Sequence, residues 1–107
     1  MTFVANLGTI VLKMRTINEA IDPLEALFGE TRRLVLALLY SHADEAYYLR
    51  KILRLTGVSP GAGQRELKRL TRAGILVRSS AEGRVYFQAS PACPIYAELK
   101  SLFIGKF

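Results

Sequence analysis

The sequence has little of the chemistry that disulfides, metal sites and enzymes require. Among 107 residues there is one cysteine, Cys93, one histidine, His42, and no tryptophan. A single cysteine excludes a disulfide within the chain and a cysteine-rich metal site. His42 stands beside Asp44 and Glu45 in a polar segment, but a metal or catalytic site needs further partners, so we interpret it as a solvated loop residue. We expect a reducing compartment, a structural role for Cys93, and neither metal nor cofactor.

Long apolar runs are missing as well. The longest, Leu34 to Tyr40, is far shorter than the roughly 20 residues that a membrane-spanning helix needs. No basic region precedes an apolar stretch at the N-terminus, as a signal peptide requires. No Ser/His/Asp set, carboxylate pair or phosphate-binding loop indicates an enzyme. We therefore expect a cytoplasmic protein that acts by binding and has no membrane partner.

Acidic residues are scarce in one part of the chain. The net charge is +6 and the pI is about 9.8. Residues 1–48 carry four basic and six acidic side chains, whereas residues 49–88 carry nine basic and two acidic ones. Positive charge concentrated in one segment is typical of a protein that binds a polyanion such as nucleic acid.

Residues 48–73 have the pattern of two helices joined by a tight turn. Apolar residues recur through the first helix, 50–55, and Gly57 ends it because glycine adopts a left-handed conformation at little cost. Ser59 and Pro60 begin the second helix as a capping hydroxyl and a first-turn proline. Two helices with a short glycine-containing connection, the second of them basic, predict a helix-turn-helix.

The second helix, 60–73, separates a packing face from a basic face on a helical wheel. Its packing face holds Gly63, Leu67, Leu70 and Gly74. We predict that its N-terminal part enters the major groove of double-stranded DNA, where glutamine pairs with adenine and arginine with guanine. The candidate base-contacting residues are Ser59, Gly61, Ala62, Gln64 and Arg65, and the candidate phosphate contacts on this helix are Lys68, Arg69 and Arg72.

Two β-rich runs, 75–80 and 84–89, follow the helix-turn-helix. Ala81, Glu82 and Gly83 join them, which is a hairpin signal. A basic hairpin directly after a helix-turn-helix predicts a winged helix, whose wing, residues 75–89, lies along the DNA backbone or minor groove. The remaining candidate DNA-binding residues are Arg78 and Arg84 of the wing and Arg50, Lys51 and Arg54 of the first helix.

The two ends of the chain carry the candidate dimer interface. Apolar residues recur in steps of four and three at Phe3, Leu7, Ile10, Met14, Ile17 and Ile21, which predicts a helix of about five turns. A small winged domain has little surface to cover so long a stripe, so we favour a dimer interface over packing within the chain. Met14 is an alternative start of translation. The C-terminal helix, 95–104, either caps the core or joins the interface through Leu99, Leu102 and Phe103.

The middle of the chain supplies the core. Residues 31–40 are apolar nearly all round, as is typical of a central buried helix, and Asp22 caps a short helix before it. Arg32 and Arg33, at the N-terminal end of the central helix, are either solvated or reach a phosphate. The predicted fold is mainly α with a small β-hairpin: a dimerisation helix at 1–22 and a winged helix-turn-helix domain at 23–107.

Three stretches resemble the ArsR-like winged-helix transcriptional regulators: LFGETRRLVLALL (27–39), LRKILRLTGVSPGAGQRELKRLTRAGIL (49–76) and GRVYFQASPACPIYAELKSL (83–102). The chain looks most like a branch whose winged helix sometimes precedes a nucleotidyltransferase domain, which is absent here. The resemblance implies a cytoplasmic homodimeric transcription factor that binds an inverted-repeat operator. We favour a repressor over an activator, although the sequence does not decide between them. The sequence names no small-molecule effector.

The chain departs from this family at two places. Metal-sensing members carry a cysteine pair in the helix-turn-helix or His, Asp and Glu ligands on the terminal helix, whereas residues 49–55 lack cysteine and residues 95–104 offer only Glu98. We therefore expect no metal sensing. Members carry a larger residue near Gly63, so we expect the recognition helix to pack more loosely here. The alternative function is a winged-helix protein-interaction module that regulates a partner such as a nucleotidyltransferase.

Overall fold

The computed structural model describes residues 22–107, so the N-terminal stripe of candidate dimer contacts lies outside the described residues. The first element, α2 (Pro23–Phe28), begins where Asp22 Oδ1 accepts the Leu24 N–H at 3.0 Å. Gly29, with a φ of 82°, separates it from α3 (Glu30–Ser41). A positive φ at this position favours glycine because a Cβ would be strained there. Among the described residues, no helix is long and apolar enough to cross a membrane.

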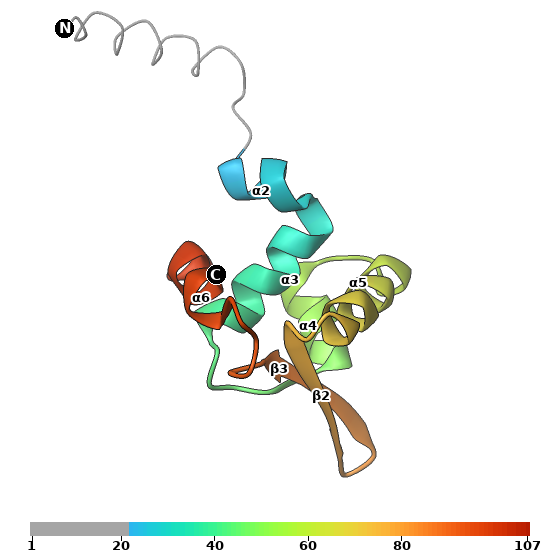
Figure 1. Ribbon diagram of the computed structural model, residues 1–107. Helices are drawn as coiled ribbons and strands as arrows, with labels where there is room; N and C mark the ends of the chain where they lie inside the picture. The colour runs from blue at the N-terminus through green and yellow to red at the C-terminus, as the bar shows by residue number, and fades with distance from the viewer. Residues whose placement is uncertain (1–21) are drawn as a thin grey trace, which may run out of the picture.

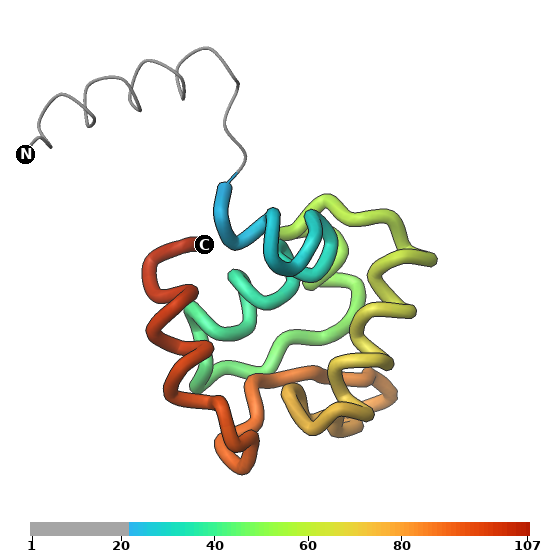
Figure 2. Tube along the Cα trace, turned by 45° about the horizontal axis from the view of Figure 1, so that its top comes forward, coloured from blue at the N-terminus to red at the C-terminus, as the bar shows by residue number. Residues whose placement is uncertain are grey.

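The central helix α3 is buried on all sides along its second half, as its sequence predicts. Every residue from Val35 to Tyr40 is buried. Figure 1 shows α3 running between α6 (Tyr96–Phe103) and the helix pair α4 (Leu49–Thr56) and α5 (Pro60–Arg72). Figure 2 shows the same order from a second direction. The other helices and the sheet therefore pack around one helix.

The helix-turn-helix is confirmed, together with the residues that end and begin its helices. Gly57 takes the left-handed conformation, with a φ of 76°, and its N–H donates to the Leu53 carbonyl. The Ser59 hydroxyl accepts the Ala62 N–H at 3.4 Å at the start of α5. The turn between the helices is therefore built from the capping chemistry that the sequence indicates.

Gly63 lies where α5 packs closely against α4 and the turn. A Cβ at this position would lie 2.4 Å from Leu53 Cδ2 and 3.0 Å from Val58 Cγ2, which is closer than normal contact allows. The expectation of looser packing near Gly63 is therefore wrong. The glycine permits a tighter approach of the two helices than any larger residue would.

The wing is part of a three-stranded antiparallel sheet with the order β1-β3-β2. Strands β2 (Leu76–Ala81) and β3 (Arg84–Ala89) form the predicted hairpin, and β1 (Tyr47–Tyr48) pairs with β3. The connection holds two residues rather than three, because Ala81 pairs with Arg84. Glu82 and Gly83 both have positive φ, of 53° and 76°, as a two-residue hairpin turn requires.

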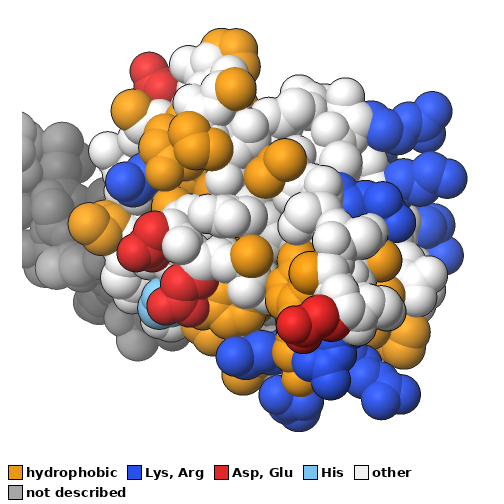
Figure 3. All heavy atoms as spheres, turned by 90° about the horizontal axis from the view of Figure 1, so that it is seen from below, with side chains coloured by type: hydrophobic (Ala, Val, Ile, Leu, Met, Phe, Trp, Pro, Cys, Tyr) orange, Lys and Arg blue, Asp and Glu red, His pale blue; other side chains and the backbone are white. Residues whose placement is uncertain are grey.

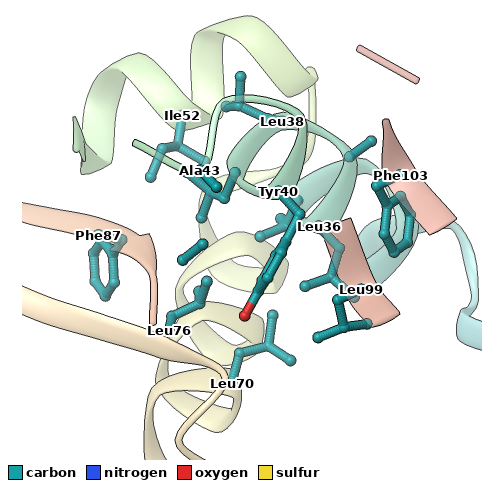
Figure 4. Close-up of a cluster of buried hydrophobic side chains, with 14 of the residues drawn as sticks. Leu36, Leu38, Tyr40, Ala43, Ile52, Leu70, Leu76, Phe87, Leu99 and Phe103 are labelled. Carbon is teal, nitrogen blue, oxygen red and sulfur yellow. The ribbon is translucent and has the colours of Figure 1, made fainter. Parts of the chain in front are cut away.

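Side chains from every layer meet in one core (Figure 4). The ring of Tyr40 lies inside it, and its hydroxyl donates to the Ile75 carbonyl at 2.7 Å. Burial raises the pKa of this hydroxyl above its ordinary range. Because Ile75 precedes β2, this hydrogen bond fixes the start of the wing to the central helix.

The C-terminal helix α6 closes the core. Leu99 and Phe103 are buried against α3, and the Ser41 hydroxyl donates to the Phe103 carbonyl. Of the two roles that the sequence leaves open for this helix, Leu99 and Phe103 have the core-capping one. Their side chains are not available to a second chain, because other residues of the same chain already surround them. Leu102 alone of the three candidate contacts is exposed, at 43%.

Candidate nucleic-acid interface

The candidate DNA-binding residues lie at the surface of the helix-turn-helix and the wing. Eleven of the thirteen are exposed, and Ala62 and Lys51 are half-buried. The opposite side of α5 is buried against the rest of the protein through Gly63, Leu67 and Leu70. The helix therefore has one face available to a ligand, and that face carries the arginines and lysine.

The polar face of α5 divides into two stripes. Gln64, Lys68 and Arg72 recur every fourth residue and border a hollow between α5 and the wing. Arg65 and Arg69 lie along the other side of Lys68 and Arg72, away from the wing. Both stripes start in the N-terminal half of α5, at Gln64 and Arg65, and continue toward its C-terminal end.

The side chain of Arg65 runs back along α5 toward its N-terminus. A Cβ built at Gly61 would lie 3.4 Å from Arg65 Nη1. Helical side chains lean toward the N-terminal end of their helix, and the small residue at position 61 leaves room for the guanidinium. The guanidinium therefore lies over the first turn of α5.

The one acidic residue of α5, Glu66, is held by the central helix. Arg32 of α3 donates from Nε and Nη2 to the two carboxylate oxygens, with Nη2 at 3.3 Å from Oε1. The hydrogen bond with Glu66 raises the pKa of Arg32 above its ordinary value. The pair joins α3 to α5 and keeps a carboxylate away from the basic face. Arg32 is thus an ion-pair partner rather than a solvated or phosphate-contacting residue.

Arg33 of α3 also lies beside a carboxylate. Its Nε is 4.0 Å from Glu25 Oε1 of α2, and the Nε atom is buried without a hydrogen-bond partner among the described residues. Its nearest carboxylate belongs to the helix before α3, and the side chain is mostly covered. The two arginines at the start of α3 therefore connect helices to one another.

The two arginines of the wing lie on opposite faces of the hairpin. Arg78 is paired with Phe87, on the face that packs toward α5, and it borders the same hollow as Lys68 and Arg72. Arg84 is paired with Ala81 on the other face, where its guanidinium carbon lies 4.3 Å from the centre of the Tyr48 ring. Of the two, only Arg84 is at the tip, next to the turn.

Two of the candidate DNA-binding cations, Arg84 of the wing and Lys51 of α4, lie over tyrosine rings. The rings of Tyr48 and Tyr86 meet edge to face at 6.0 Å, and Lys51 Nζ lies 5.2 Å from the centre of the Tyr47 ring. Burial raises the pKa of Tyr47 to about 12. A cation above an aromatic face is attracted by the ring, which restricts where the charge points. Arg50 and Arg54, on the same helix as Lys51, are exposed.

Figure 3 shows the side of the molecule on which the wing lies, and positive and negative charges are separated across it. Lysine and arginine side chains gather along one side and the lower edge of this view, whereas most acidic side chains and the histidine lie toward the opposite side. That histidine, His42, lies in the turn that follows α3 and is half-buried, with the rings of Tyr47 and Phe107 both 6.3 Å away, so it is a loop residue that is only partly solvated. Within residues 22–107, no three His, Cys, Asp or Glu side chains gather into a metal-ligating group.

Comparison of the whole chain with known proteins identifies its fold. No protein-family model and no curated protein matches the sequence. The crystal structure of the adhesin competence repressor AdcR from Streptococcus pyogenes is similar, with a TM-score of 0.54 at 15% identity over 94% of this chain and 69% of AdcR. The fold is that of a winged helix. The haem sensor PefR from Streptococcus agalactiae, solved with haem, has the same TM-score at 13% identity over 94% of this chain and 74% of PefR.

Sequence reasoning missed three features of the interface. The ion pair of Arg32 and Glu66 joins residues 34 positions apart, so no local sequence pattern predicts it. The stacking of Arg84 on Tyr48 depends on the pairing of β1 with β3, which the sequence does not specify. The opposite orientation of Arg78 and Arg84 follows from strand alternation once the turn is known to hold two residues, so a correct turn length would have predicted it.

Proposed function

We propose that this winged-helix protein is a transcriptional regulator, a repressor, that binds double-stranded DNA sequence-specifically as a homodimer. In this proposal α5 enters the major groove and the wing lies on the backbone or in the minor groove. The fold likeness to a repressor and a haem sensor supports a regulatory role, and the ArsR-like sequence resemblance supports the same class. The chain then acts by binding and not as an enzyme, in the cytoplasm.

One observation carries the proposal: the exposed face of α5 presents cations without a competing carboxylate. Glu66 is the acidic residue of this helix, and Arg32 engages both of its oxygens. Lys68, Arg69 and Arg72 are exposed and form no ion pair within residues 22–107. A face of this kind attracts the phosphate backbone strongly, because each neutralised phosphate releases condensed counterions.

We divide the residues of α5 into those that would contact DNA bases and those that would contact phosphates. Gln64 and Arg65 are the candidate base readers, since a bidentate amide suits adenine and a guanidinium suits guanine. Arg65 is well placed for this role because its guanidinium lies over the first turn of the helix, beside Gly61. Lys68, Arg69 and Arg72 follow along the helix and are assigned to phosphates.

The wing and α4 extend the contact at two separate places. Arg78 shares the α5 side of the hairpin, so we assign it to the phosphates next to the recognition helix. Arg84 lies at the tip on the other face, so we assign it to the backbone or the minor groove beyond. Arg50, Lys51 and Arg54 of α4 add further positive charge along the flanking backbone.

The proposed dimer would use exposed apolar residues near the two ends of the chain. Leu27 of α2 and Ile104 after α6 are 73% and 74% exposed, and Leu102 is 43% exposed. The apolar stripe from Phe3 to Ile17 is a further candidate in the sequence. Sedimentation of the wild type and a Leu102→Glu, Ile104→Glu double variant tests this: a dimer that becomes a folded monomer is expected, and an unchanged mass would contradict the assignment.

Selection of bound duplexes from a random DNA pool, followed by footprinting, tests the function itself. We expect an inverted repeat with half-sites about one helical turn apart. Binding of the selected duplex should weaken with salt, and Arg72→Ala should reduce the slope of log K against log salt by about one unit. No enrichment over random DNA, together with capture of a protein partner instead, would favour the interaction-module alternative.

A further inference from the structure

A hollow of about 390 Å³ lies between α5 and the wing, and we call it the α5–wing hollow. Its walls come from four consecutive elements: the start of α4, the wing-facing stripe of α5, and both strands of the hairpin. The residues that line it are Leu49, Gln64, Leu67, Lys68, Thr71, Arg72, Arg78, Val85 and Phe87.

The floor of the hollow is apolar. Leu67 and Phe87 are buried core residues, and Leu49 and Val85 are half-buried. Arg78 pairs with Phe87 across the hairpin, and Val85 lies two residues along on the same face. The floor is therefore continuous from the recognition helix to the wing.

The rim of the hollow is cationic. Lys68, Arg72 and Arg78 are exposed, and none of them pairs with a carboxylate in the described part of the chain. Three unpaired cations around an apolar floor favour a ligand with both an anionic group and an apolar body. A phosphate of DNA would neutralise the cations but would leave the apolar floor in contact with water. DNA binding alone therefore does not account for the apolar floor.

We propose that the α5–wing hollow binds a small aromatic anion, an organic carboxylate or sulfonate with one or two rings. The ring system would lie on Val85 and Phe87, while the anionic group would meet Arg72 and Arg78. A guanidinium can both pair with the anion and stack on the ring, which an inorganic ion cannot exploit. The volume is within the range of pockets that hold small organic ligands.

Such a ligand would exclude DNA. This consequence rests on the proposed function, because Lys68, Arg72 and Arg78 are the side chains assigned there to phosphates. The ligand neutralises these cations and occupies the space between the recognition helix and the wing. The hollow would then be the site at which a small molecule releases the protein from its operator.

Titration of the full chain with 1-anilinonaphthalene-8-sulfonate, followed by fluorescence, tests the binding site. Val85→Trp fills the hollow from the wing, and Val77→Trp places the same ring on the opposite face of the same hairpin, where Val77 is 46% exposed. We expect Val85→Trp to weaken binding by about tenfold or more, since a change of one apolar group in a pocket has an effect of this size. We expect Val77→Trp to leave the affinity unchanged.

Two further measurements keep the proposal falsifiable. If Val85→Trp does not fold, as judged by circular dichroism, Thr71→Trp narrows the same hollow from α5. Inorganic phosphate at matched ionic strength should not displace the probe. Equal affinities of the Val85→Trp and Val77→Trp variants, or displacement by phosphate alone, would overturn the proposal.

A competition experiment separates the ligand site from the DNA-binding role. The probe should displace the selected duplex from the wild type with a midpoint that tracks its own affinity. Probe binding that Val85→Trp abolishes, in a chain that binds no DNA, would support the site and reject the proposed function. DNA binding that persists when the probe is bound would overturn the exclusion of DNA.

Discussion

The two faces of α5 are made from the same thirteen residues, yet they have opposite physical properties. One face, formed by Gly63, Leu67 and Leu70, is buried against α3, α4 and the wing. The other, formed by Gln64, Arg65, Lys68, Arg69 and Arg72, is exposed. Residues that are adjacent in the sequence, such as Leu67 and Lys68, therefore lie on different faces, one buried in the core and the other exposed to solvent.

From this difference we expect that stability and the proposed DNA binding depend on separate residues of this helix. Burial of the apolar face contributes to the free energy of folding, whereas the exposed cations contribute little to it because water already solvates them. Glu66 lies between the two faces and is half-buried, and its pairing with Arg32 belongs to the packing side. Four sets of variants test whether the division holds.

The largest effect is expected from the adjacent pair Leu67→Ala and Lys68→Ala. Leu67 is 1% exposed, so its truncation should lower the free energy of unfolding by about 2–5 kcal/mol, measured by urea denaturation. Lys68→Ala should change stability by less than about 0.5 kcal/mol, as exposed substitutions usually do. A comparable decrease in stability in both variants would show that the faces are not independent.

The second pair compares two glycines of the same helix. A methyl group at Gly63 meets Leu53 and Val58, so Gly63→Ala should be less stable than Gly61→Ala by about 1–3 kcal/mol. Both variants gain the same helix propensity to a first approximation, so the difference in thermal or urea unfolding isolates the packing cost. Equal stabilities would mean that Leu53 moves aside without cost.

The third prediction concerns the exposed face alone. Arg65→Ala should weaken binding of the selected duplex by about 1–3 kcal/mol and relax the preference at one base pair, with unchanged thermal stability. Arg69→Ala is the control, because removing a side chain that binds only phosphate should weaken binding to every sequence alike. Uniform weakening by Arg65→Ala across a panel of single-base variants would reassign Arg65 to the backbone.

The smallest effect is expected where the two faces meet. A double-mutant cycle of Arg32→Met and Glu66→Gln should give a coupling of about 0.2–1 kcal/mol in unfolding, since both side chains are partly exposed. Glu66→Gln with Arg32 intact should leave DNA affinity nearly unchanged, because the carboxylate is already neutralised. A marked gain in affinity would show that Glu66 repels DNA despite its partner.

Local chemistry made much of the fold predictable. The caps at Gly57 and Ser59, the all-round apolar run of α3 and the hairpin signal each depend on residues within a few positions of one another, and all three predictions were confirmed. The turn length was wrong by one residue because Ala81 is compatible with both a strand and a turn. That error concealed which face of the wing each arginine occupies.

The candidate site was predictable in composition but not in arrangement. The sequence alone determined which residues carry charge, where α4 ends and α5 begins, and which face of α5 must be buried, because these follow from side-chain polarity, capping residues and helical periodicity. Only the tertiary structure decided that Arg32 engages Glu66, that Arg84 stacks on Tyr48, and that the wing closes a hollow against α5. These contacts join residues that are distant in the sequence, and their geometry is set by the packing of the surrounding elements against α3.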